Sequence, residues 1–131
     1  MDCIYQTGRK KLCITNGIAL DSPDVGVFID KNYTVWGLGD ALAQGVMDTY
    51  GDRMCSQIIP GTDYVIIFDE DSVVEVYSHK YIFNDCLIMK ATDKGAKCIP
   101  ADEVDDVRRA FRKNTVNYLV GPVEFKAYRL T

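Results

Sequence analysis

Short apolar runs separated by turn-forming residues fill most of this chain. This pattern is typical of β-strands, whose successive side chains point to opposite faces of a sheet. Two hairpins are predicted near the start of the chain. In the first, CIYQ and KLCIT flank TGRKK, and in the second, VGVFI and YTVWG flank DKN.

The middle of the chain predicts further strands. DYVIIFD has a solid apolar centre and is expected to be a buried strand. The acidic turn EDS follows it, and VVEVYS is predicted to return beside it, so that the two form a hairpin. Shorter strands are expected at YIF and CLIMKA, and the alternating segment PVEFKAYRL is expected to close the chain.

A helix is predicted from Ala41 to Tyr50, with Asp40 as its N-cap and Gly51 as its stop. The stretch that enters it, VWGLGDALAQG, has two of the glycines of a dinucleotide-binding fingerprint. Leu42 occupies the place of the third glycine, and no P-loop lysine follows. The stretch therefore predicts a tight turn into a helix, and no nucleotide or other cofactor is expected.

A second helix is predicted within IPADEVDDVRRAFRKN. Its acidic residues come first and its basic residues last, an order that complements the helix dipole. Val104, Val107 and Phe111 supply an apolar stripe at helical spacing.

Blocks of strands divided by helices predict one α+β domain over residues 1–131. The short turns favour antiparallel pairing, because parallel strands need long crossover connections. We expect two stacked antiparallel sheets with a helix covering each outer face.

Composition narrows the possible functions. The chain has 131 residues and a formal net charge of −4, without a long basic run, so nucleic-acid binding is not expected. No signal peptide is recognisable, and no apolar run approaches the length of a membrane span. Five cysteines without a CxxC pair and a single histidine argue against a zinc site and favour a reducing cytoplasm.

Four segments together resemble the N-terminal-nucleophile hydrolases, in particular proteasome β-type subunits and their bacterial and phage relatives. They are ITNGIALDS, YTVWGLGDALAQG, DYVIIFDEDSVVEVYS and the closing segment KGAKCIPADEVDDVRRAFRKNTVNYLVGPVEFKAYRL. The resemblance implies a shortened proteasome-like αββα sandwich, in which two antiparallel sheets lie between helical layers. It also implies self-association into rings, that is, a homo-oligomer.

The catalytic residues of that family are missing from their expected places. Asp2 stands where the nucleophile would follow Met1, and the family's lysine falls on Val25 or Gly26. The family's aspartate falls near Ile18. The resemblance therefore implies an inactive relative, a non-catalytic binding or assembly protein with a protein partner. A small acidic chain of this kind also fits a phage protein that acts on a host protein.

Cys3 supports an alternative hypothesis. If processing removed Met1 and Asp2, Cys3 would carry both a thiol nucleophile and the α-amine that serves as its base. The chain would then be an amidohydrolase or peptidase. His79 is a weaker candidate for a general base, because a lone histidine near a strand edge is more often a surface residue.

The acidic residues support a third hypothesis, a small inhibitor or immunity-like protein that binds a basic partner. They fall in two groups, and acidic surfaces of this kind speed the encounter with a basic protein. The segment FDEDS lacks the glycine of a calcium-binding EF-hand loop and is expected to be a solvated turn. The residues of this candidate interaction surface are Asp69, Glu70, Asp71, Asp102, Asp105 and Asp106.

Intact mass spectrometry of the purified protein tests the Cys3 hypothesis. We expect Met1 and Asp2 to be retained, because aspartate is a poor neighbour for removal of the initiator methionine. A mass that lacks both residues would contradict this expectation and make Cys3 the favoured nucleophile.

Overall fold

The computed structural model describes residues 24–130. The first predicted hairpin, Asp2, Cys3 and Ile18 lie outside the described residues.

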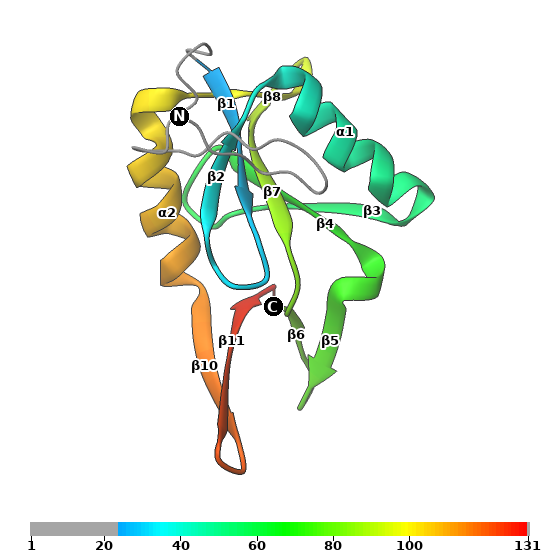
Figure 1. Ribbon diagram of the computed structural model, residues 1–131, viewed down its shortest axis with the longest axis vertical. Helices are drawn as coiled ribbons and strands as arrows, with labels where there is room; N and C mark the ends of the chain where they lie inside the picture. The colour runs from blue at the N-terminus through cyan, green and yellow to red at the C-terminus, as the bar shows by residue number, and fades with distance from the viewer. Residues whose placement is uncertain (1–23, 131) are drawn as a thin grey trace.

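The larger of two antiparallel sheets forms the centre of the molecule (Figure 1). Its seven strands are β1 (Asp24–Ile29), β2 (Val35–Leu38), β3 (Met54–Ile58), β4 (Tyr64–Asp69), β7 (Cys86–Thr92), β8 (Gly95–Lys97) and β9 (Ile99–Pro100). The main order is β2-β1-β7-β4-β3, while β8 pairs with β7 and β9 pairs with β1. The β1–β2 hairpin is the predicted one, with Phe28 opposite Trp36.

A smaller sheet lies below the larger one in the view of Figure 1. Its four strands are β5 (Val73–Val76), β6 (His79–Ile82), β10 (Thr115–Val120) and β11 (Val123–Arg129), in the order β10-β11-β6-β5. Only the end of β11 pairs with β6, so the rest of the β10–β11 hairpin projects from the molecule (Figure 1).

Two α-helices complete the described fold, together with three 3₁₀ turns, Gly51–Arg53, Glu70–Ser72 and Ala101–Glu103. Helix α1 (Asp40–Tyr50) ends at Gly51, whose φ of 56° confirms the predicted stop. The predicted N-cap was wrong by one residue: Gly39 is the N-cap, and the Asp40 carboxylate accepts a hydrogen bond from the thiol of Cys98. Helix α2 (Val104–Lys113) has acidic residues in its first turn and basic residues in its last, as predicted.

Both faces of the larger sheet are buried, and each is covered by one helix (Figure 1). In β4 the residues from Tyr64 to Phe68 are all buried, as predicted for this strand. Ile66 belongs to the apolar cluster that contains α2, whereas Ile67 belongs to the cluster that contains α1. This alternation explains the continuous apolar runs of the central strands, because a strand with one solvated face would alternate with polar residues.

Glu103 fastens the start of α2 to the larger sheet. The hydroxyl of Tyr64 donates a hydrogen bond of 2.8 Å to Glu103 Oε1, and Lys90 Nζ lies 3.0 Å from the same oxygen. Both contacts favour the charged carboxylate, so the pKa of Glu103 is lowered, first by the Tyr64 hydrogen bond and then by Lys90. One side chain thus links α2 to β4 and β7.

The predicted hairpin of DYVIIFD and VVEVYS was wrong. Strand β4 pairs with β3 and β7, whereas β5 pairs with β6 in the other sheet. The acidic turn Glu70–Ser72 carries the chain from one sheet to the other rather than back along β4. Strands β3, β8, β9 and β10 were not predicted, and β10 completes a hairpin with the predicted closing strand.

The coarse fold prediction is confirmed: the protein is α+β, with two antiparallel sheets, two helices and mostly strands. The layers of the described residues differ from the expected order. Apolar residues of α1 and α2 pack on opposite faces of the same sheet, whereas the predicted sandwich has two stacked sheets between its helices. The smaller sheet instead contributes Ile82 and Tyr128 to the edge of the α2 cluster.

The contact of α1 with β1 should be sensitive to one methyl group. A Cβ atom built on Gly26 would lie 2.9 Å from Cβ of Ala43 and 3.0 Å from Sδ of Met89. We expect Gly26→Ala to lower the free energy of unfolding by about 1–3 kcal/mol, because extra volume strains a packed core. Chemical denaturation measures this change.

Gly45→Ala is the matched control. No atom lies within 4 Å of the Cβ position at Gly45, and alanine is favoured over glycine in a helix by about 1 kcal/mol. This variant should therefore be at least as stable as the wild type. Equal stability of Gly26→Ala and the wild type would contradict the close contact.

Candidate functional site

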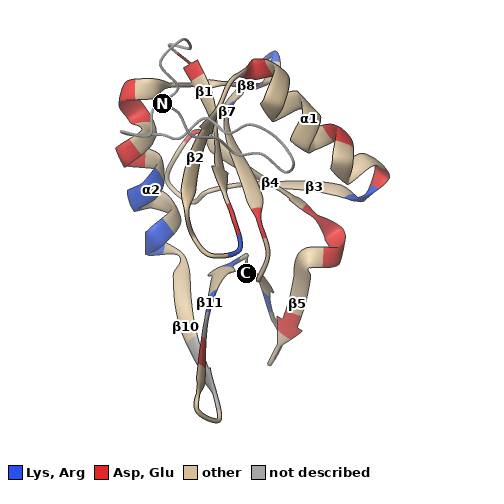
Figure 2. Ribbon diagram, viewed as in Figure 1, with Lys and Arg blue, Asp and Glu red and all other residues tan. Residues whose placement is uncertain are grey.

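The acidic residues predicted to form one interaction surface lie in two separate places (Figure 2). Asp69, Glu70 and Asp71 lie at the end of β4 and the turn after it, whereas Asp102, Asp105 and Asp106 lie at the start of α2. The two groups are on opposite sides of the molecule in Figure 2. Asp69 is also occupied by Arg53, whose hydrogen bond holds the pKa of this carboxyl below its usual range.

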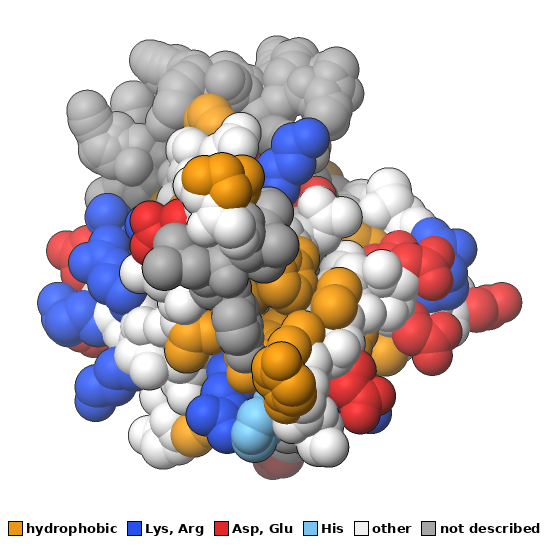
Figure 3. Space-filling model, turned by 90° about the horizontal axis from the view of Figure 1, so that it is seen from below, with side chains coloured by type: hydrophobic (Ala, Val, Ile, Leu, Met, Phe, Trp, Pro, Cys, Tyr) orange, Lys and Arg blue, Asp and Glu red, His pale blue; other side chains and the backbone are white. Residues whose placement is uncertain are grey.

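The other candidate residues within the described part of the chain have structural contacts. Nη2 of Arg129 lies 3.1 Å from Nδ1 of His79 and 3.4 Å from its Nε2, so the ring is in contact with a cation. His79 is the pale blue side chain of Figure 3. Val25 is fully buried and Gly26 has no room for a side chain, so neither place fits the family's lysine. Residues 24–130 contain no group of three His, Cys, Asp or Glu side chains placed to hold a metal ion.

A cavity of about 460 Å³ opens where four segments meet. The turn between β1 and β2 forms one wall, the last turns of α2 form the second, and β10 and β11 form the third. The lining residues are Ile29, Asn32, Tyr33, Val35, Arg108, Phe111, Arg112, Thr115, Asn117 and Lys126. We call this cavity the basic pocket.

The charged residues that line the basic pocket are all cations. Arg108 and Arg112 are one helical turn apart on α2, and Lys126 reaches the pocket from β11. No acidic residue lines it in the described part of the chain. Arg108 has an exposed ion pair with Asp105 at 3.5 Å, but neither Arg112 nor Lys126 has an ion pair with a described residue. Two cations thus remain available to an anion.

Aromatic rings form the floor of the basic pocket. Tyr33 packs edge-on against Phe111, with ring centroids 5.8 Å apart, and Lys126 Nζ lies 5.9 Å from the centre of the Tyr33 ring. Tyr33 has a φ of 66°, a conformation that is uncommon for residues other than glycine. Asp30 holds this turn, because its carboxylate accepts hydrogen bonds from the backbone N–H groups of Asn32 and Thr34.

A second cavity, of about 350 Å³, adjoins the basic pocket. The two share Asn32, Tyr33 and Lys126, and the second adds Lys31, Phe83 and Glu124. The two cavities are contiguous through these shared residues, so a ligand longer than a single ion can contact both.

The residues of the basic pocket can bind an anion but offer little for catalysis. Arginine and lysine side chains are permanent or nearly permanent donors, so they hold carboxylate or phosphate oxygens without accepting a proton. Burial raises the pKa of Tyr33 to about 12, which keeps its hydroxyl protonated at neutral pH. The Thr115 hydroxyl donates a hydrogen bond to the backbone carbonyl of Phe111.

Sequence reasoning identified the pocket arginines only as partners of the helix dipole. The available sequence signal was their spacing, because residues four apart lie on the same helix face. Lys126 lies in a separate segment, so no local pattern predicts that it lies near them.

Comparison of the chain with protein-family models, with curated proteins and with solved structures finds no match. Among the described residues, neither helix combines the length and apolar character needed to cross a membrane.

Proposed function

We propose that this chain is a non-catalytic binding protein that holds an acidic segment of a protein partner in the basic pocket. The observation that carries the proposal is the lining of that pocket, which has three cations and no acid although the chain has a net charge of −4. The rest of this acidic chain repels an acidic segment, so the cations of the basic pocket direct such a segment to one place on the surface.

Two features favour a protein segment over a free anion. The adjoining cavity shares Lys126 with the basic pocket and adds Lys31 and Glu124, so a ligand with charges of both signs can extend from one cavity into the other. An exposed aromatic residue, Tyr77, lies in the turn between β5 and β6 with 92% of its surface exposed. Tyr77 and Ser78 both have positive φ, as in hairpin turns that usually contain asparagine and glycine. Exposed tyrosines are enriched at protein interfaces.

The broader hypotheses from the sequence stay predictions. The proteasome-like sandwich, the phage origin and the action on a host protein are compatible with a binding role, but the helix placement in the described residues gives the sandwich little support. The acidic inhibitor hypothesis has less support than binding of an acidic segment in the basic pocket, because the acidic residues that it needs lie on opposite sides of the molecule (Figure 2). Amide or peptide hydrolysis by Cys3 depends on a residue outside the described range.

Arg112→Ala should weaken binding of a fluorescein-labelled hexaglutamate peptide. We expect a loss of about tenfold, because a hydrogen bond to a charged group contributes about 1.5 kcal/mol. Fluorescence anisotropy at low ionic strength measures the dissociation constant.

Arg109→Ala is the control for this experiment. Arg109 is the third arginine of α2, and its replacement changes the net charge by the same amount. Its side chain forms an ion pair with Asp106 and does not line the pocket. We expect its affinity to stay within about twofold of the wild type, since exposed charges are screened. Equal losses in both variants would show that general electrostatics, not the basic pocket, binds the peptide.

Self-association also has a candidate contact in the structure. Strand β3 pairs only with β4 among the described strands, and Met54 and Ile58 on one face of it are each 46% exposed. If two β3 strands paired in antiparallel fashion about Ser56, Met54 of each copy would lie opposite Ile58 of the other. The strand is therefore complementary to itself.

Light scattering coupled to size-exclusion chromatography tests this homo-oligomer. We expect a mass above that of the monomer, and Ile58→Lys should shift it toward the monomer because a charge blocks an edge strand. A matched change at Val123, an exposed residue on β11, should leave the mass unchanged. A monomeric wild type at high concentration would contradict the prediction.

A further inference from the structure

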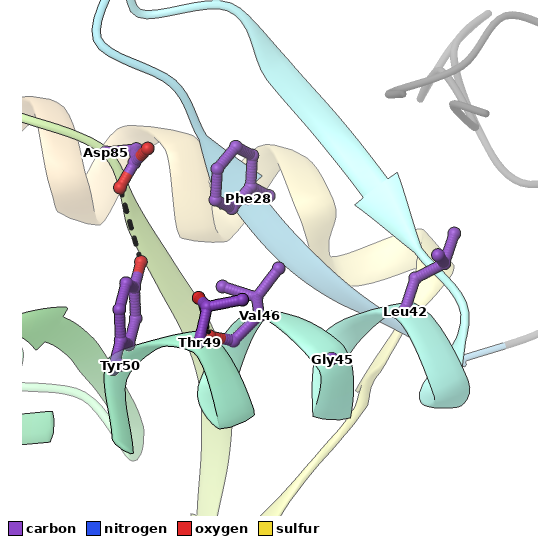
Figure 4. A pocket seen from close by; sticks show the side chains of 7 residues that line it. All are labelled: Phe28, Leu42, Gly45, Val46, Thr49, Tyr50 and Asp85. Carbon is purple, nitrogen blue, oxygen red and sulfur yellow. Dashed lines mark hydrogen bonds between the residues drawn. The ribbon is translucent and has the colours of Figure 1, made fainter. Parts of the chain in front are cut away.

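A separate cavity of about 220 Å³ lies on the other face of the larger sheet, between α1, β1 and the start of β7 (Figure 4). Its lining residues are Phe28, Leu42, Gly45, Val46, Thr49, Tyr50 and Asp85. Figure 4 shows that the side chains of Tyr50 and Asp85 point toward one another at one end of this cavity, and Leu42 lies at the other. We call it the α1 cavity.

The α1 cavity has apolar walls and one carboxylic acid. Phe28, Leu42 and Val46 provide the apolar surface, and Asp85 is the only carboxylic acid among the described lining residues. The hydroxyl of Tyr50 donates a hydrogen bond to Asp85 Oδ1, but at 3.4 Å this bond is long. This long hydrogen bond therefore offsets only a small part of the free energy that the Asp85 carboxylate loses when it is removed from water.

The electrostatic surroundings of Asp85 are negative. Burial is the main cause of the raised pKa of Asp85, and the nearby carboxylates of Asp30 and Asp69 raise it further. The Tyr50 hydrogen bond and the charge of Lys31 lower it without cancelling these effects. A cation at the mouth of the cavity would reverse this balance, because an opposite charge favours the ionised carboxylate.

Gly45 lines the α1 cavity at a cost to the helix. Glycine within a helix is less favourable than alanine by about 1 kcal/mol. Its Cβ position has no atom within 4 Å, so packing against the rest of the protein does not require glycine there. Because Gly45 lines the cavity, a larger side chain at this position would reduce its volume.

We infer that the α1 cavity binds an ammonium group carried on an apolar chain, with the ammonium at Asp85 and the chain along Phe28 and Val46. The combination of apolar walls and one carboxylate at the end defines this class of ligand. A neutral apolar molecule would bring no positive charge to Asp85, and an anion would be repelled by Asp30, Asp69 and Asp85.

Two sources present the same chemistry, a free alkylamine and a lysine side chain of another protein. The experiment uses n-hexylamine for the first and Nα-acetyl-lysine methylamide for the second. Isothermal titration calorimetry and chemical-shift changes at Tyr50 and Asp85 report binding. We expect saturable binding of at least one of the two amines, and the tighter one identifies the source.

Asp85→Asn tests the ion pair. We expect a loss of affinity of about tenfold for the amine, because a hydrogen bond to a charged group is lost, while 1-hexanol binds the wild type and the variant equally. Asp52→Asn is the control, because Asp52 is exposed on the turn after α1 and does not line the cavity. It should bind the amine as the wild type does.

Two further measurements separate binding from folding. Asp85→Asn should raise the Tm at neutral pH, because it removes a poorly compensated carboxylate and keeps a hydrogen-bond acceptor for Tyr50. Gly45→Leu should remain folded but block the amine by filling the cavity. In the wild type, affinity should increase as pH rises through the raised pKa of Asp85, since the ionised form then becomes available.

The inference is overturned if neither amine binds the wild type, or if Asp85→Asn binds n-hexylamine as tightly as the wild type does. Unchanged binding to Gly45→Leu would also overturn it, because the ligand would then lie elsewhere. None of these results depends on the basic pocket, so the proposed function is tested separately.

Discussion

Burial of both faces of the larger sheet is the constraint on which the rest of this structure depends. Strands β1, β4 and β7 bury apolar side chains toward α1 and toward α2, so neither helix can be lost without exposing a sheet face. The close approach of Ala43 to Gly26 sets the distance of α1 from the sheet, and the Glu103 contacts fix the start of α2. Apolar burial contributes roughly 25 cal/mol per Å², so these two faces dominate the stabilising free energy.

The same sheet separates two cavities of opposite character. The basic pocket lies on the α2 side, where the β10–β11 hairpin leaves the body of the molecule beside the end of that helix. The α1 cavity lies on the other side and has a carboxylate at its end. Because a packed sheet lies between them, a ligand in one cavity does not contact a ligand in the other. The two proposals therefore rest on independent observations and describe different recognition events.

The sequence predicted local structure well and spatial pairing poorly. Periodicity and end residues located the β1–β2 hairpin and both helices, because these features are set within about ten residues. Strand β4 pairs with β3 and β7. No local sequence pattern distinguishes this pairing from a hairpin of β4 with β5. Arg112 and Lys126 likewise line the same cavity only because Phe111 of α2 stacks on Tyr128 of β11. The candidate site was not predictable for the same reason: its residues come from segments far apart in the chain.

Three features that cost stability lie in the linings of the two cavities. Tyr33 has a left-handed backbone conformation in the lining of the basic pocket, and Gly45 and Asp85 line the α1 cavity. Each has a replacement that would remove the cost: glycine at position 33, alanine at position 45 and asparagine at position 85. Gly26 is different, because packing explains it: a side chain at this position would collide with Ala43. Unfavourable residues without such a packing reason are expected where binding, rather than stability, determines the side chain.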